Sequence, residues 1–153
     1  MESFEISDVR GLMNALLVNN VFDAYYVIEV RVNVRNSWTI GGKIDSSDDE
    51  NGNNQYLKWS ELKTSVFNIV RGKTLPKLLN VSFIMPEDIV GKVLDKAGGQ
   101  YSVNDIKSLH MNLRFENSIL SIISGTTLSG FSMDKTIEHA WDGVCETIIK
   151  DYE

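Results

Sequence analysis

Apolar and polar side chains alternate in two stretches of the chain, residues 26–35 and 109–115. A period of two places one set of side chains toward a core and the other toward solvent, as in a half-buried antiparallel strand. Tyr26, Ile28, Val30, Val32 and Val34 are predicted to face the core in the first stretch. The outward side chains of the two stretches are Glu29, Arg31, Asn33, Arg35, His110, Asn112 and Arg114.

Apolar residues at helical spacing predict four amphipathic helices. The first covers 8–18 with Ser7 as its N-cap, and the second runs from Trp59 to a stop at Gly72. The third has Pro86 in its first turn and ends at Gly98-Gly99. The last covers about 134–150. Shorter apolar runs predict further strands over 4–6, 38–44, 78–84 and 119–123, and the small residues of 124–130 predict a loop.

The predicted order is strand, helix, strand, strand, helix, and it occurs twice. This order indicates an α+β fold with duplicated β-α-β-β-α units, in which antiparallel sheet packs on helices. The chain of 153 residues has the length of a single domain, 1–153, with candidate repeat halves 1–75 and 76–153. A duplication predicts a pseudo-twofold arrangement with one continuous sheet or two related sheets.

Composition and charge narrow the classes of function. The single cysteine, Cys145, cannot form an intrachain disulfide, and no apolar segment approaches the length of a signal peptide core or a membrane span. We therefore expect a cytoplasmic protein without a membrane partner. The net charge is −6, which argues against nonspecific nucleic-acid binding. Residues 58–114 nevertheless carry a net charge of +4, which leaves room for a local anion-binding patch.

Two loops resemble known ligand-binding motifs but lack the required residues. Gly72-Lys73-Thr74 matches the end of a phosphate-binding loop, yet Phe67 stands where the motif needs its first glycine. Residues 45–55 contain no apolar side chain and predict an exposed, mobile loop. With Gly52 as its turn glycine, a calcium loop would need acids where Ser47 and Lys58 stand. A solvated loop is the simpler interpretation of residues 45–55.

Few residues suit metal or covalent chemistry. His110 and His139 are too far apart in sequence to share a helical metal site, and Cys145 follows His139 by six residues. No nucleophile-elbow sequence is present. No cofactor is therefore predicted. We expect His139 to be solvated, Cys145 to pack in or beside the core, and Trp38, Trp59 and Trp141 to anchor it.

Several short runs resemble a known family. They are Phe4-x-Ile6-x-Asp8-Val9, Phe22-Asp23, Ile40-Gly41-Gly42 and Phe131-Ser-Met-Asp134-Lys135-x-Ile137-Glu138-x-x-Trp141-Asp142. Together they resemble a family of bacterial proteins catalogued only as a domain of unknown function. The resemblance covers nearly the whole chain and implies no catalytic residue. In element order alone, the repeated units are also similar to sliding-clamp domains of DNA replication.

Two hypotheses about function follow. The first is a non-enzymatic binding module, either a monomer or a homodimer, whose polar sheet face binds a protein or a small anionic ligand through the seven outward residues named above. The second is a small-ligand-binding protein or an enzyme with a site between the two halves, where His110 and nearby acids would supply acid–base chemistry. A deep polar pocket beside His110 would favour the second hypothesis.

Overall fold

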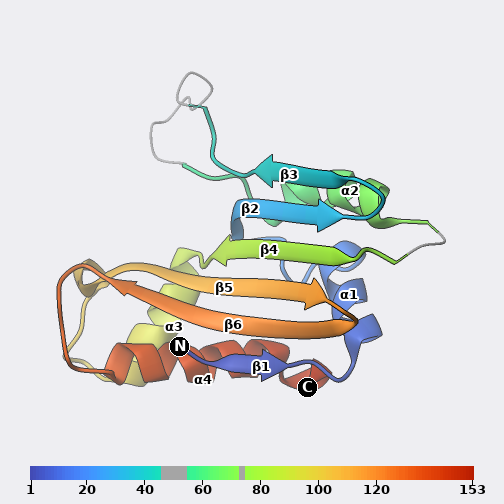
Figure 1. Ribbon diagram of the computed structural model, residues 1–153. Helices are drawn as coiled ribbons and strands as arrows, with labels where there is room; N and C mark the ends of the chain where they lie inside the picture. Colours follow the sequence, from blue (N-terminus) through green and yellow to red (C-terminus); the bar gives the residue numbers. More distant parts are fainter. Residues whose placement is uncertain (46–54, 73–74) are drawn as a thin grey trace.

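The computed structural model describes residues 1–45, 55–72 and 75–153 (Figure 1). Its strands pair into one six-stranded antiparallel sheet with the order β1-β6-β5-β4-β2-β3. The fold is therefore α+β, as predicted. The elements along the chain are β1 (Ser3–Glu5), α1 (Val9–Leu17), β2 (Tyr26–Asn33), β3 (Ser37–Gly41), α2 (Trp59–Val70), β4 (Leu78–Ile84), α3 (Glu87–Ala97), β5 (Ile106–Glu116), β6 (Ile119–Leu128) and α4 (Thr136–Ile149), with 3-10 turns at Val103–Asp105 and Lys150–Tyr152.

The four helices pack against one face of the sheet (Figure 1). Every second residue of β4, such as Leu79, Val81 and Phe83, is buried on this face, and so are Leu12 of α1 and Trp141 of α4. All of these side chains belong to one continuous core cluster. Apolar residues on the opposite face of the sheet are not part of that cluster. The sheet therefore has one covered face and one face that no described helix covers.

The two halves share their element order but not their strand pairing. In the second half β4 pairs with β5, whereas the corresponding β1 and β2 of the first half are not neighbours. Instead β1 lies at the outer edge beside β6, with Phe4 opposite Ile122. The predicted duplication is not confirmed, because this strand order does not repeat under a twofold exchange of the halves.

A β-bulge in β2 shifts the phase of the alternating pattern. The pairing with β4 is irregular between Val27 and Glu29, so Val27 is fully buried. Tyr26 pairs instead with Ile84, on the face away from the helices. The prediction that Tyr26 and Ile28 face the core was therefore wrong, since one extra residue in a strand reverses the sides of all residues before it. Glu29, Arg31 and Asn33, which follow the bulge, face outward as predicted.

β6 is longer than the sequence indicated. It continues through Leu128, so the predicted loop over residues 124–130 is wrong for its first five residues. Small side chains suit this part of the strand, because Ser124 is fully buried against α4 and bonds to Asp142. The β5–β6 hairpin turns at Asn117 and Ser118, whose φ angles of 55° and 65° are typical of a tight two-residue turn.

Side-chain carboxylates accept main-chain hydrogen bonds at the starts of α1 and α4. Asp8, rather than the predicted Ser7, is the N-cap of α1 and accepts a hydrogen bond from Gly11 N at 3.0 Å. Asp134 lies one residue before Lys135, the N-cap of α4, and accepts a hydrogen bond from Thr136 N at 2.9 Å. Pro86 stands at the N-cap of α3 rather than inside its first turn. Across the described ranges, no helix is long and apolar enough to span a membrane.

Two of the three tryptophans anchor the core. Trp59 and Trp141 are fully buried, and their indole N–H groups donate to the main-chain oxygens of Leu16 at 2.7 Å and His110 at 3.0 Å. The prediction that Trp38 also anchors the core was wrong, because this side chain is 45% exposed on the edge strand β3. A side chain on an edge strand has a neighbouring strand on one side only, and this halves the packing available to it.

Candidate functional site

The open face is the side of the sheet away from the helices, and it carries most of the predicted site residues. Strand β4 lies between β2 and β5 and joins their polar side chains into continuous rows. One row runs from Arg31 through Asn80 to Arg114. The next row runs from Glu29 through Ser82 to Asn112. The polar members of the open face are Ser3, Glu5, Glu29, Arg31, Asn33, Ser37, Thr39, Asn80, Ser82, Ser108, His110, Asn112, Arg114, Glu116, Ser121 and Thr127.

The two arginines of the open face are exposed, and each is paired with a glutamate on its own strand. Arg31 Nε lies 3.2 Å from Glu29 Oε2, and Arg114 bonds to Glu116. Their side chains are 59% and 47% exposed, so these ion pairs are screened and contribute little to stability. Each guanidinium keeps donors that its single carboxylate partner does not use. Both arginines can therefore bind a partner without breaking the fold.

Small polar side chains occupy the centre of the open face. Ser82 Oγ donates to Asn112 Oδ1 at 3.0 Å. Asn80 Oδ1 is buried and accepts no hydrogen bond from the described residues. A buried acceptor without a donor raises the free energy of the folded state by about 1–3 kcal/mol. Arg31 and Arg114 lie on either side of Asn80 in the same row.

His110 lies on the open face but is not arranged as an acid–base catalyst. Its Nε2 is within hydrogen-bond distance of the hydroxyls of Ser108, at 2.7 Å, and Thr127, at 3.3 Å. Burial lowers the pKa of His110 from its usual value near 6.5, so the ring is neutral at pH 7. No carboxylate bonds to the ring in the part of the chain that the structure describes. Neither pocket described below is lined by His110.

The structure brings together six of the seven predicted residues. Arg35 is the exception, because it follows the end of β2 in the turn where Val34 N donates to Asn36 O at 3.1 Å. Sequence reasoning also missed Asn80 and Ser82, which complete the rows between β2 and β5. The signal was present in the sequence, since Asn80 and Ser82 alternate with Leu79, Val81 and Phe83.

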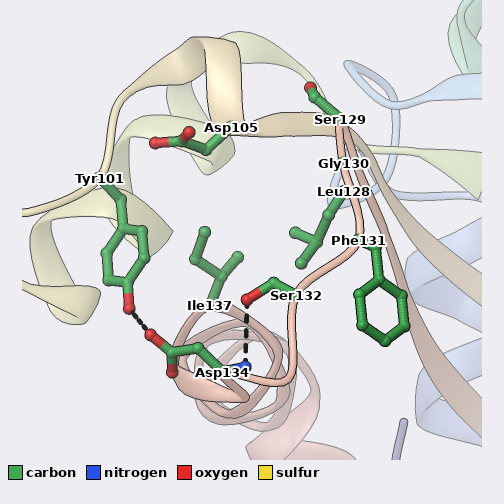
Figure 2. A pocket seen from close by; sticks show the side chains of 9 residues that line it. All are labelled: Tyr101, Asp105, Leu128, Ser129, Gly130, Phe131, Ser132, Asp134 and Ile137. Carbon is green, nitrogen blue, oxygen red and sulfur yellow. Dashed lines mark hydrogen bonds between the residues drawn. The ribbon is translucent and has the colours of Figure 1, made fainter.

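A small pocket lies between the segment 101–105 and the start of α4 (Figure 2). Tyr101 donates its hydroxyl to Asp134, and Ser132 Oγ accepts from Asp134 N at 3.1 Å. Hydrogen bonds from Thr136, together with the one from Tyr101, lower the pKa of Asp134 to about 2. The carboxylate is thus fully engaged as a helix cap and is too weak a base to accept a proton near neutral pH. The volume of about 170 Å³ is below the range of roughly 300–1,000 Å³ typical of small-molecule sites.

A second pocket of about 290 Å³ lies beside the bulge of β2 and is lined by Tyr26, Ile44, Tyr56, Lys58 and Glu61. Lys58 Nζ lies 6.0 Å from the centre of the Tyr26 ring, at the outer limit of a cation–π contact. The Glu61 carboxylate accepts a hydrogen bond from Lys58 N at 2.8 Å, at the start of α2. The Glu61 carboxylate is therefore engaged at the start of α2, and Lys58 supplies the positive charge of the pocket lining.

The residues with metal or nucleophile chemistry do not form a site. His139 is exposed on α4, as predicted. Cys145 is buried in the core, where burial raises the pKa of its thiol to about 12. Within the described ranges no group of three or more His, Cys, Asp or Glu side chains could hold a metal ion. Most of the loop tested as a calcium site, including Ser47 and Gly52, and Lys73-Thr74 of the phosphate-loop sequence lie outside the described residues.

Comparisons with known proteins give a family but no activity. A family model described as a family of unknown function, DUF5721, matches residues 15–153. The matched range includes the last three residues of α1 and every element after it. No curated protein and no solved structure matches the chain. The similarity to sliding-clamp domains therefore rests only on the order of secondary-structure elements.

Proposed function

Since the chain belongs to DUF5721, a family of unknown function, we propose its function from the site alone: it is a non-enzymatic cytoplasmic binding module whose open face docks a partner protein. The observation that supports this proposal is the row Arg31–Asn80–Arg114 on a sheet face that no described helix covers. Two exposed arginines lie on either side of Asn80, whose buried Oδ1 accepts no hydrogen bond from the described residues.

The shape of the open face favours a protein over a small molecule as the partner. Its central side chains are short, and neither of the two described pockets is lined by Asn80, Ser82 or Asn112. A small ligand is usually bound in a concave site that buries most of its surface, whereas protein partners bind flat surfaces. Because each arginine already has a carboxylate partner, a bare anion must compete with Glu29 or Glu116. A protein surface can instead complement the whole ion pair.

The proposal predicts which substitutions abolish partner binding. Replacing Arg31 and Arg114 together by Ala removes both cationic groups of the central row and leaves the buried face of the sheet unchanged. A matched control replaces Arg10 and Arg71 by Ala, because both are exposed, lie in or at the end of helices and change the net charge equally. We expect both double variants to fold with unchanged far-UV circular dichroism and thermal midpoint.

The experiment is a quantitative capture from native lysate, followed by titration of the identified partner with each purified variant. Loss of at least tenfold in affinity for the Arg31/Arg114 variant alone is the expected result. Equal affinity of both double variants would show that the open face does not bind that partner. A small carboxylate or phosphate that raises the thermal midpoint of the wild type, but not of the Arg31/Arg114 variant, would move the assignment to a small anionic ligand.

A further inference from the structure

The outer edge of β3 is an unprotected strand edge. β3 is the last strand of the sheet, and no described residue pairs with its outer side. Proteins usually protect such edges with charged residues, proline or a bulge. The sequence Ser37-Trp-Thr-Ile-Gly41 has none of these. Its five residues are exposed except for the half-buried Ile40.

The register identifies which main-chain groups of β3 are unused. Gly42 N donates to Ile28 O at 2.9 Å, and the pairing between the two strands is regular from there to Ser37. Because hydrogen-bonded and non-bonded pairs alternate in an antiparallel ladder, Trp38 and Ile40 bond to β2. The N–H and C=O groups of Ser37, Thr39 and Gly41 therefore point away from the sheet. They present three donors and three acceptors at the spacing that an added strand requires.

Side chains and charges around this edge specify the strand that would fit. Trp38 and Ile40 lie on one side of β3, opposite Val32 and Val30 of β2, and offer an apolar strip. Ser37, Thr39 and Gly41 lie on the other side and leave room for small polar residues. Beyond the two ends of the strand stand the exposed cations Arg35 and Lys43.

We infer that the edge of β3 is a docking site for an extended peptide segment of a partner protein, in which small polar and apolar residues alternate between two acidic ends. The peptide adds antiparallel to β3, and its acids lie opposite Arg35 and Lys43. The hydrogen bonds of this site are made by the main chain at the edge of β3, so the inference does not depend on the function proposed for the open face.

A second copy of the chain fits this edge less well than a peptide. A twofold pairing centred on Thr39 would place Arg35 of one copy opposite Lys43 of the other at both ends, and like charges facing across strands are destabilising. The contact would also involve about five residues from each copy, whereas a stable protein–protein interface uses roughly 20–30 residues on each side. An acidic peptide avoids the like-charge repulsion, and a contact of this small size is typical of a weak, reversible complex.

The test uses the full chain and a nine-residue synthetic peptide, acetyl-Glu-Ser-Thr-Val-Thr-Val-Thr-Ser-Glu-amide. Titration followed by NMR should shift the amides of Ser37, Thr39 and Gly41 and slow their hydrogen exchange. A peptide with Lys in place of both Glu residues should bind at least threefold more weakly. A peptide N-methylated at its three Thr residues should not bind, because its donors to β3 are blocked.

A substitution in β3 tests whether its outward main-chain donors bind the peptide. Thr39→Pro removes one outward donor without removing a β2–β3 hydrogen bond, and it should weaken binding at least about fivefold. Thr39→Ala keeps that donor and should bind within about twofold of the wild type. Circular dichroism confirms that both variants fold, and the N-methylated peptide gives an independent answer should Thr39→Pro unfold.

Three results would overturn the inference. The first is no shift at millimolar peptide. The second is a set of shifts centred on Asn80 and Asn112, which would place the peptide on the open face. The third is slowed exchange at Ser37, Thr39 and Gly41 that rises with protein concentration in the absence of peptide, which would assign the edge to a second copy.

Discussion

Trp59 should be the most sensitive single position for the stability of the N-terminal half. Its indole donates to Leu16 O, one of the last carbonyls of α1 and therefore one without a partner inside the helix. Trp59→Phe leaves this buried carbonyl unsatisfied, which costs about 1–3 kcal/mol. The smaller ring also vacates roughly 40 Å³ beside Phe83, worth ~1 kcal/mol at ~24 cal/mol per Å³. The expected loss in free energy of unfolding is about 2–4 kcal/mol.

Urea denaturation followed by far-UV circular dichroism measures this loss, because the signal does not depend on the tryptophan that is replaced. Trp38→Phe is the matched control, since the same atoms are removed from a side chain that is 45% exposed. We expect the control to change the free energy of unfolding by less than about 0.5 kcal/mol. A Trp59→Phe variant as stable as the control would refute the role assigned to the Leu16 carbonyl.

Three further predictions concern the turn, the thiol and the cap of α4. Ser118→Gly should stabilise the protein by about 1 kcal/mol in the same urea assay, because glycine adopts the φ of 65° without strain. Cys145 should react with a thiol reagent at pH 8 only when urea unfolds the chain, since burial raises its pKa to about 12; rapid labelling of the native protein would contradict its place in the core. The pKa of Asp134 is lowered from 3.8 to about 2 by bonds from Thr136 and Tyr101, so its contribution to stability is present above pH 3.8 and is lost as the pH falls through 2. Asp134→Asn should therefore flatten the fall of the thermal midpoint between pH 5 and pH 2, and an unchanged slope would refute this.

The sequence predicted the elements whose patterns are local. The alternation from Leu109 to Phe115 and the apolar spacing of the helices depend on residues close to one another in the chain, and the structure confirms both. Ser124 and Gly125 show where such local reasoning fails. Small residues such as these are typical of a loop, yet pairing of both with β5 and the hydrogen bond from Ser124 to Asp142 of α4 hold them in a strand. That pairing joins residues distant in sequence, and no local pattern reports it.

The sequence predicted only part of the candidate site, because the site also depends on strand pairing that local patterns do not show. Alternation correctly assigned Arg31 and Arg114 to the outward side of their strands. It could not show that β4 inserts between these strands, so Asn80 was overlooked although it links the two arginines. The bulge at Ile28 and the exposure of Trp38 also follow from the position of each strand in the sheet rather than from its own residues.

The pairing of β1 with β6 has a consequence for the order in which the chain folds. Residues 3–5 find their partners at residues 121–123, so this pairing closes most of the chain into a loop. Such a nonlocal contact carries a large entropic penalty before it contributes any stability, and it tends to form late. During synthesis β1 cannot pair until β6 has been made, whereas β2 can pair with β3 and β4 before that point. The outermost strand at this end of the sheet is thus encoded first and expected to be added last.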